Sequence, residues 1–442
     1  MIRALKSIGL AAIATGLAHN ANAAMPAVPI LSDYVPAYRC VRDFHVDAAA
    51  MPGADGSAEH PWKSPQAAND SGTLRAGDCV DLAAGAYNLD ASLRLTRGGD
   101  RNTPDGYVVY RSLEPHGAHL IAHPGVYQVV NVQTAYIVID GLDIDGNHAS
   151  ASEALSVAGN PAHHHIVVEH NVIHDAGGGG LQMNDSEYFW VIGNLIYGNA
   201  NINTWQESGI STYQAQAATD FTPTKADAAL PWHIVIAGNI SRDNGETYAC
   251  PTPGCHTDGN GIIVDKTLNV DRQGGVPYTG GVLVAGNLVY GNGGAGIQVF
   301  LSQNVTVANN TVYDNHLDTQ NEGTWRGELS NVNSDHVAWV NNIACAVPGT
   351  GILANNSAIL AATMDHYDNA DVTWTRNLTC GGGVKVSSVN GAVRPSLNLL
   401  ERNPRFSDLA GQDFSLRGDS PARQAGQPEA WLKAPAPDIG AY

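Results

Sequence analysis

The sequence is poor in positive charge. It contains 23 Lys and Arg residues against 42 Asp and Glu residues, and its formal net charge is −19 at pH 7. A surface this acidic disfavours nucleic acids and anionic lipids as partners, because both carry negative charge themselves. An anionic substrate would need a bridging cation to bind to such a protein.

Long hydrophobic runs are missing beyond the start of the chain. The small, apolar stretch Ser7–Leu17 follows the basic residues Arg3 and Lys6 and precedes the small-x-small sequence Ala21–Ala23. This order is typical of a secretory signal peptide, and we expect residues 1–23 to be one and the protein to be secreted or periplasmic. No later run approaches the roughly 20 apolar residues that a membrane-spanning helix needs.

Cysteine is scarce, and no Cys-x-x-Cys pair is present, so a cysteine-based metal site is not expected. In a secreted chain the six cysteines would form disulfides. Two of them stand three residues after an Asn of the repeat described next, two share one loop, and two are left for the N-terminal region. The predicted pairs are, in that order, Cys345–Cys380, Cys250–Cys255 and Cys40–Cys79.

No segment carries a helix-length amphipathic pattern. Instead, the stretch from His165 to Cys380 repeats one unit: an alternating apolar run, an Asn, two or three mostly apolar residues, a turn, a Gly and another apolar run. The Asn recurs as Asn171, Asn194, Asn239, Asn287, Asn310, Asn342 and Asn377. The first two are 23 residues apart. Repetition at this length indicates stacked coils that bury a shared core.

The recurring Asn predicts a ladder of side-chain amides inside one corner of the stack. Asn tolerates a bent or left-handed backbone and can hydrogen-bond to the neighbouring turn. A set of separate surface turns is the alternative, but apolar residues follow each Asn, and this favours the interior ladder. The expected fold is therefore an all-β solenoid, a right-handed parallel β-helix.

The repeat and its flanks resemble the pectate-lyase-like superfamily of secreted β-helix proteins. In Gly56–Trp62 and Arg75–Tyr87 the order G-x-x-x-x-P-W, G-D-x-V, G-x-Y is similar to the N-terminal cap of such enzymes. We expect residues 24–125 to form this cap and the first coils, residues 126–397 the β-helix, and residues 398–442 a C-terminal closing segment. This single-domain solenoid is expected to be a monomer.

The repeat is stretched in its middle. Asn194 and Asn239 are 45 residues apart, and Asn239 and Asn287 are 48 residues apart. The extra residues fall in 214–230, 245–258 and 267–278. Insertions into a solenoid gather on one face, often the binding face, so these loops should wall a groove over the middle coils.

The strands that begin after a recurrent Gly should form the floor of this groove. In each, the second and fourth residues after the Gly should point outward. The outward set is Gln182, Asn184, Ser211, Tyr213, Ile263, Asp265, Gln298 and Phe300. Polar groups mixed with aromatics suit a carbohydrate, although an ordinary wet sheet face is the alternative. The candidate substrate-binding residues are Gln182, Asn184, Tyr213, His256, Asn260, Gln298, Phe300 and Trp205.

The stretch His256–Lys266 is the richest in reactive groups. Its Asp258-Gly259 and Lys266 resemble a D-G…K motif of polysaccharide lyase family nine, with two additional residues before the Lys. An Asp–Gly turn before a strand is the purely structural alternative. The acids that cluster around this stretch offer the oxygen ligands that Ca²⁺ prefers. The candidate metal ligands are Asp243, Asp258, Asp265 and Glu207.

The resemblance implies a polysaccharide lyase that acts on a uronate-containing polymer with the help of Ca²⁺. Such an enzyme removes the proton α to the carboxylate, whose developing charge Ca²⁺ or Arg can stabilise. Lys266 is the candidate base, and Arg242, Arg272 and Arg326 are candidate charge stabilisers. A glycoside hydrolase that uses two of the clustered acids is the main alternative. A non-catalytic glycan-binding protein is a third.

Overall fold

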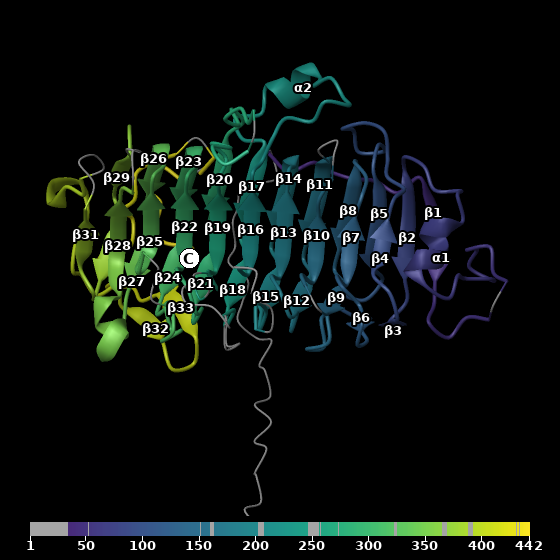
Figure 1. Cartoon of the computed structure of the whole chain (residues 1–442), viewed down its shortest axis with the longest axis horizontal. Coiled ribbons are helices and arrows are strands. Elements are labelled where there is room, and N and C mark those ends of the chain that lie inside the picture. The colour runs from purple at the N-terminus through teal and green to yellow at the C-terminus, as the bar shows by residue number, and fades with distance from the viewer. Residues whose placement is uncertain are drawn as a thin grey trace, which may run out of the picture.

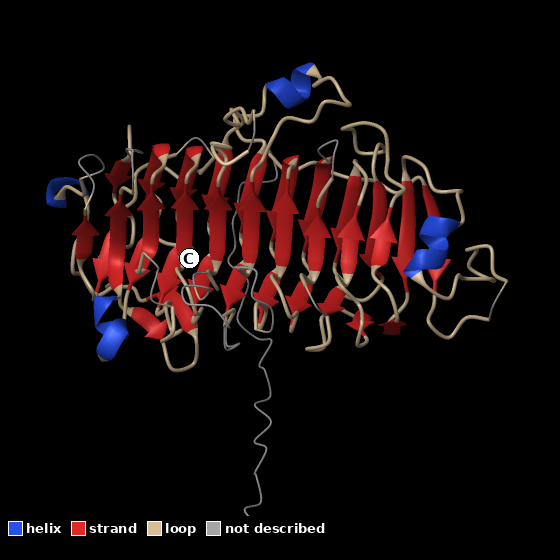
Figure 2. Cartoon of the chain, in the orientation of Figure 1, coloured by secondary structure: helices blue, strands red, loops and turns tan. Residues whose placement is uncertain are grey.

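The structure is a computed structural model of the chain. It describes residues 34–51, 53–150, 152–159, 163–201, 207–245, 256, 258–272, 274–321, 325–364, 369–387, 392–429, 431–432 and 434–442. The expected signal peptide and the predicted Cys250–Cys255 disulfide lie outside these residues. In the described part, parallel strands wind into a long tube (Figures 1 and 2).

Three long, all-parallel sheets form the walls of the tube, and we name them A, B and C. Sheet A contains β1 (Arg42–Val46), β2 (Asp78–Leu82), β5 (Val108–Ser112), β8 (Ile137–Asp140), β11 (His164–Glu169), β14 (Glu187–Ile192), β17 (Ile234–Ala237), β20 (Val282–Ala285), β23 (Gln303–Ala308), β26 (Asp335–Val340) and β29 (Thr373–Thr375). Sheet B contains β3 (Gly85–Leu89), β6 (Ala118–Ala122), β9 (Asp143–Asp145), β12 (Val172–His174), β15 (Leu195–Tyr197), β18 (Ile240–Arg242), β21 (Leu288–Tyr290), β24 (Thr311–Tyr313), β27 (Ile343–Cys345) and β30 (Leu378–Cys380).

Sheet C faces the viewer in Figure 1. It contains β4 (Leu93–Leu95), β7 (Val130–Val132), β10 (Leu155–Val157), β13 (Leu181–Asn184), β16 (Ile210–Tyr213), β19 (Ile262–Asp265), β22 (Ile297–Phe300), β25 (Gly327–Val332), β28 (Ser357–Ala362) and β31 (Val384–Val386). From β2 onward, each coil contributes one strand to each sheet, and each strand pairs with its equivalent in the next coil. The predicted right-handed parallel β-helix is confirmed.

Helices are short in the described residues. They are α1 (Pro65–Asp70), α2 (Lys225–Ala228) and the 3₁₀ turns Gly351–Asn355 and Pro395–Leu397. None of these helices has the length and apolar character required to span a membrane.

Alternation along the strands builds the core. In sheet A, for example, Val168, Val191 and Ile236 stack in register from coil to coil and are at most 1% exposed. Their neighbours in the sequence point to the other face, because successive side chains of a strand alternate. This row ends at Trp339 and Trp374, whose rings stack 4.8 Å apart.

The predicted ladder of Asn side chains is confirmed. Asn194 Nδ2 donates to Val168 O (2.9 Å) and to Asn239 Oδ1 (3.0 Å), and the backbone N–H of Asn194 donates to the same Oδ1. The pattern repeats from Asn171 through Asn377 and extends to Asn398. The seven predicted members are at most 1% exposed. Each amide therefore satisfies buried backbone groups of two neighbouring coils.

A second ladder, which the sequence analysis missed, lies one turn further along each coil. It runs through Asn199, Asn244, Asn292 and Asn315 with the same geometry. Glu328 ends it by accepting hydrogen bonds from the backbone N–H and the side-chain amide of Asn315. Burial raises the pKa of Glu328 to about 8. The available signal was an Asn five residues after four of the first-ladder residues, Asn194, Asn239, Asn287 and Asn310.

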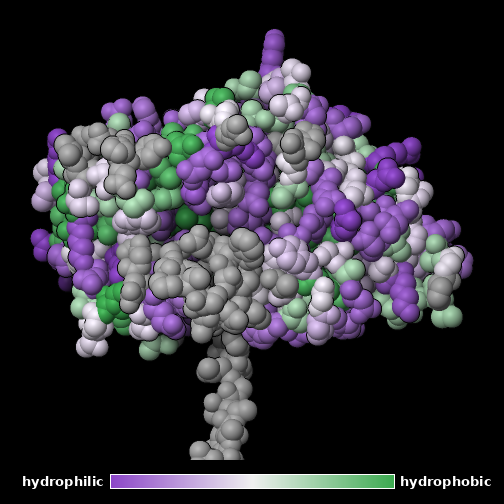
Figure 3. All heavy atoms as spheres, viewed as in Figure 1, coloured by the Kyte–Doolittle hydropathy of each residue, from purple (hydrophilic) through white to green (hydrophobic). Residues whose placement is uncertain are grey.

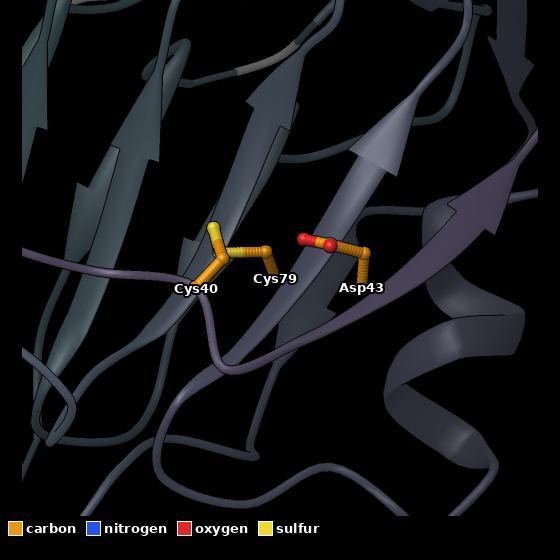
Figure 4. Close-up of side chains that lie close together, drawn as sticks. All are labelled: Cys40, Asp43 and Cys79. Atoms are coloured by element: carbon orange, nitrogen blue, oxygen red, sulfur yellow. A yellow bond between two sulfur atoms is a disulfide. The ribbon is translucent and has the colours of Figure 1, made fainter.

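The N-terminal cap closes the first coil. Gly56 adopts a φ of +82°, and a Cβ there would lie 2.7 Å from the Trp62 ring, so only glycine fits the G-x-x-x-x-P-W motif. Trp62 in turn stacks on Phe44, with ring centroids 5.0 Å apart. A disulfide joins Cys40 to Cys79, as predicted (Figure 4).

The C-terminal segment covers the outer face of sheet B. Its antiparallel hairpin of β32 (Phe406–Asp408) and β33 (Asp413–Leu416) is followed by a chain that also packs on the sheet. Its buried side chains Phe406 and Phe414 join Leu288, Ile343 and Leu378 of sheet B in one apolar cluster. The second predicted disulfide, Cys345–Cys380, links adjacent strands of the same sheet.

The outer face of sheet A is also covered. Tyr34 and Tyr38 of the N-terminal segment and Trp431 of the C-terminal segment pack against its apolar outward residues, which include Trp190 and Leu283. The chain's own termini thus occupy parts of two outer faces. The outer face of sheet C carries a hollow over its middle coils.

Candidate active site

A hollow of about 430 Å³ lies on the outer face of sheet C. It is lined by Tyr127, Ser152, Glu153, Gln182, Asn184, Glu207, Ser211, Tyr213, Asp258, Ile263, Asp265 and Lys266. Strands β13, β16 and β19 supply the floor, and the turns that precede β10, β16 and β19 supply much of the rim. Figure 3 shows that hydrophilic side chains predominate on this face over the middle and N-terminal coils.

Strand register sets which side chains form the floor. The outward rows run Gln182, Ser211, Ile263, Gln298 and Asn184, Tyr213, Asp265, Phe300. The predicted alternation is therefore confirmed for all four strands. The hollow takes the first three members of each row, while Gln298 and Phe300 lie one coil further along.

Two acids of the hollow, Asp258 and Asp265, bind their protons more tightly than ordinary carboxyl groups do. Burial raises the pKa of Asp258 to about 7, although the hydrogen bond from Asn260 and the charge of Lys266 act against this rise. Burial, together with the charge of Asp258, raises the pKa of Asp265 well above its ordinary value. With a pKa near neutrality, Asp258 can take up or release a proton at about pH 7.

Lys266 enters the hollow because the backbone turns there. It follows the last residue of β19 and has a φ of 56°. The equivalent residues of other coils, Asp185, Gln214, Leu301 and Asn333, also have positive φ, so each coil turns this corner through a left-handed residue. Strict alternation of side chains along the strand would have pointed the Lys266 side chain into the core of the tube.

The charge of Lys266 is fixed by its neighbours. Its Nζ lies 2.7 Å from Asp271 Oδ2 and 5.7 Å from the centre of the Tyr213 ring. Burial acts to lower the pKa of Lys266, but the hydrogen bond to Asp271 and the charge of Asp265 raise it further, and the net pKa is above its ordinary value. Lys266 can act as a base only if these negative charges are neutralised.

Several unpaired polar atoms lie on the outer face of sheet C. Among the described residues, Asn131 Oδ1, Gln182 Oε1, Asp265 Oδ1 and Gln298 Oε1 are buried without a hydrogen-bond partner. The three amides belong to one outward row. A buried acceptor without a partner costs about 1–3 kcal/mol, so these atoms favour a polar ligand or ordered water along this face.

The other predicted binding residues are divided between the hollow and its surroundings. Asn260 is fully buried, and its Oδ1 accepts from the backbone of Ala295 (2.7 Å). The His256 ring pairs with Asp318 at 2.7 Å, outside the hollow. Glu207 lines the hollow and accepts from the backbone N–H of Gly179. Trp205 lies outside the described residues.

The structure does not bring Arg242 and Asp243 to the hollow. Arg242 ends β18 of sheet B, where its guanidinium lies 4.6 Å from the Tyr197 ring and pairs with Asp243. Asp243 lines a separate depression with Asp318. The sequence analysis expected these residues to lie near Asp258. They lie instead at the end of a sheet B strand, away from the outer face of sheet C, and both are therefore excluded from the proposed site.

The remaining arginines differ in position. Arg326 is 4% exposed and donates to Asn356 Oδ1, Asn321 O and His316 O at 2.8, 2.8 and 2.6 Å. All its donor nitrogens thus hold the surrounding turns, and it is also excluded. Arg272 pairs with Asp185 at 2.6 Å, and Asp185 directly follows Asn184 of the hollow. Arg272 therefore stays a candidate at the edge of the hollow.

Calcium ligands are available in part. Asp258, Asp265 and Glu207 line the same hollow, and Asp265 has a buried oxygen without a partner. These oxygens are of the type that Ca²⁺ prefers. Among the described residues, three potential ligand atoms lie within 4.8 Å of one another at three places, and the hollow is not one of them. Ca²⁺ in the hollow would therefore need oxygen ligands from substrate or water as well.

The sequence matches no protein-family model and no curated protein. Among solved structures, pectate lyase Pel9A is similar, with a TM-score of 0.52 and 14% identity over 94% of this chain and 99% of that chain. The Azotobacter vinelandii mannuronan C-5 epimerase AlgE4 A-module has a TM-score of 0.39 and 13% identity, with 81% of this chain and 98% of that chain covered. The similarity to pectate lyase Pel9A confirms the resemblance to pectate-lyase-like β-helix proteins at the level of the fold.

Proposed function

We propose that this protein is a secreted polysaccharide lyase that cleaves a uronate-containing polymer by β-elimination in the hollow of sheet C. The observation that carries the proposal is the position of Lys266 beside Asp258 and Asp265, on a face lined with unpaired polar atoms. Two disulfides support an extracellular location. The fold of a pectate lyase supports an enzyme that acts on polysaccharides.

β-Elimination requires a base, a proton donor and a group that stabilises the charge of the substrate carboxylate. A base takes the proton α to the uronate carboxylate, the C4–O4 bond breaks as the C4–C5 double bond forms, and O4 receives a proton. We assign the base to Lys266 and the proton donor to Asp258, whose pKa lies near neutrality. Arg272, at the edge of the hollow, is the candidate partner for the substrate carboxylate.

Ca²⁺ would be held in the hollow by Asp265 and Glu207, which leaves Asp258 to act as the proton donor. When bound, it would stabilise the carboxylate charge and thereby make the α proton more acidic. The hydrogen bond to Asp271 and, when Asp265 is ionised, the charge of Asp265 hold the proton on Lys266. A bound cation would oppose both effects and favour the free amine that a base requires. A cation would also reconcile this acidic protein with an acidic polymer.

A glycoside hydrolase is the second candidate. The observation that favours it is the pair of acids with raised pKa values in one hollow, because hydrolysis requires two carboxyl groups and no cation. In that mechanism, Lys266 would only bind substrate.

The test is an assay on pectate, alginate and a glycosaminoglycan, with and without a chelator. A lyase releases an unsaturated product that absorbs ultraviolet light, and Lys266→Ala should reduce its formation by about 10²–10⁴-fold. Lys385→Ala, on the last strand of the same sheet and outside the hollow, is the matched control. New reducing ends without ultraviolet absorbance would instead establish the hydrolase, and binding without turnover would establish a glycan-binding protein.

A further inference from the structure

Three clusters of potential metal ligands occur among the described residues, all away from the hollow of sheet C. They are Cys40, Asp43 and Cys79; Asp145, His174 and Asp175; and Asp140, Glu169 and His170. In the first, the sulfur atoms form a disulfide and cannot bind a cation as thiolates (Figure 4).

The cluster around His174 is already compensated. His174 Nε2 lies 2.9 Å from Asp143 Oδ1, and its Nδ1 lies 2.8 Å from Asp175 Oδ2. The ring also stacks on Tyr197 at 5.0 Å. Both ring nitrogens are therefore occupied by carboxylates, and the protonated imidazole is itself the cation of this network.

The third cluster is differently arranged. Asp140 and Glu169 end β8 and β11 and are directly paired in register, so their carboxyl groups lie side by side on the outer face of sheet A. His170 follows with a φ of 54°, which places its Nδ1 3.1 Å from Asp140 Oδ1. The side chain of Glu169 makes no hydrogen bond or ion pair with any described residue. The nearby Arg111 instead pairs with Asp81 and Asp43.

Neighbouring groups hold the possible ligands in position. Tyr38 donates from its hydroxyl to Asp140 Oδ2 at 2.7 Å, which leaves Oδ1 facing His170. His116 Nε2 bonds to the carbonyl oxygen of His170 at 2.8 Å. A Cβ at Gly193 would lie 3.2 Å from the His170 ring, so glycine leaves room for this ring orientation. Such supporting contacts orient first ligands in metal sites.

A cavity of about 410 Å³ adjoins the cluster. Asp140 and His170 line one side of it, and Val172, Leu195 and Ile240 of sheet B supply apolar walls. An ion held by the three side chains would thus have open positions toward a space large enough for water or a small ligand.

We propose that Asp140, Glu169 and His170 bind a divalent transition-metal ion of the Zn²⁺ type, independently of the sheet C hollow. One imidazole nitrogen and two carboxylate oxygens form a donor set that suits Zn²⁺. The ion would link two adjacent coils and compensate the two neighbouring carboxylates.

The experiment is a calorimetric titration of the metal-stripped, full-length protein with Zn²⁺, repeated with Co²⁺ and followed by visible absorption. We expect one high-affinity ion per chain and a rise in Tm on binding. Glu169→Gln and His170→Gln should each weaken binding by roughly 10- to 100-fold. Asp145→Asn, in the compensated cluster, and Asp258→Asn, in the hollow, should leave it unchanged.

Circular dichroism of the metal-free variants establishes that each is folded. The proposal is overturned if the protein binds no stoichiometric ion, if Glu169→Gln and His170→Gln both bind like the wild type, or if Asp145→Asn or Asp258→Asn abolishes binding.

Discussion

Individual buried acids determine how this protein should respond to pH. Because burial raises the pKa of Asp258 to about 7, the folded carboxyl group keeps a proton that the unfolded chain has released above about pH 4. At this group the native state then binds more protons than the unfolded state, so the contribution of Asp258 to stability falls as the pH rises from about 4 to about 7.

Asp258→Asn removes this ionisation while keeping the size of the side chain. In metal-free buffer we expect the variant to be more stable than the wild type at about pH 8, by on the order of 1–3 kcal/mol, and similar to it at about pH 5. Denaturant unfolding at both pH values measures the difference. A gap of the same size at both would show that the charge of Asp258 is not its cause.

The contribution of His174 to stability should also fall as the pH rises, but over a more alkaline range. Burial lowers its pKa, but the hydrogen bonds to Asp143 and Asp175 outweigh burial and raise the pKa to about 10. This contribution to stability is complete below the unfolded value of about 6.5 and is lost as the pH rises through about 10.

We therefore expect His174→Gln to be destabilised by about 1–3 kcal/mol near pH 6, with a smaller loss above pH 10. Thermal unfolding of wild type and variant across this range is the measurement. His123→Gln, whose partly exposed ring pairs with the exposed Asp90 outside this network, is the matched control. A loss for His174→Gln that does not depend on pH would contradict the assigned ion pairs.

The Asn ladders help to stabilise the repeated elements. In the first ladder, Asn239 donates to Val191 O and Asn287 Oδ1, while its own Oδ1 accepts from Asn194. Its removal leaves buried donors and acceptors unpaired on both neighbouring coils.

Asn239→Ala should lower the free energy of unfolding by about 3 kcal/mol or more, because several unsatisfied groups contribute about 1–3 kcal/mol each. Asn88→Ala, at an exposed position of β3, should cost less than about 0.5 kcal/mol. Equilibrium denaturation compares the two variants. Equal effects would mean that the ladder contributes no more than an exposed amide.

Sequence periodicity predicted those aspects of the elements that repeat. The period of two gave the outward rows of sheet C, and the Asn spacing gave the first ladder. Periodicity could not say which sheet follows which corner, because turn length varies between coils. Arg242 was for this reason assigned to the wrong face, and Arg326 was not recognised as a buried group that holds turns together.

The position of Lys266 illustrates a second limit. Lys266 itself adopts a left-handed backbone conformation directly after the strand, and this directs its side chain to the hollow. A Lys in the sequence does not predict this conformation, because bulky residues rarely adopt it. The clustering of Asp258 and Asp265 with it was nevertheless predictable, because all three belong to one short segment.

At the scale of the whole molecule, the terminal segments shield apolar outer faces of the tube. Phe406 and Phe414 cover sheet B where Leu288, Ile343 and Leu378 point outward. Deletion of residues 404–442 would expose this surface, and large exposed apolar patches promote association.

We expect the truncated protein to form soluble oligomers or aggregates and to have a lower Tm. Size-exclusion chromatography with light scattering and thermal unfolding measure both effects. A truncated chain that stays monomeric with an unchanged Tm would show that the segment is dispensable as a cover. Deletion of the solvent-exposed tip of the hairpin, Leu409–Gly411, is a milder control.

The left-handed corner after sheet C places one outward residue at an equivalent position in each of several successive coils. Successive coils, spaced about 4.8 Å apart, carry at this position Asp185, Gln214, Lys266, Leu301 and Asn333. A substitution at one of these positions would change one contact along an extended polymer and leave the fold of the coils intact. Chemistry and specificity could thus be moved along this protein one coil at a time.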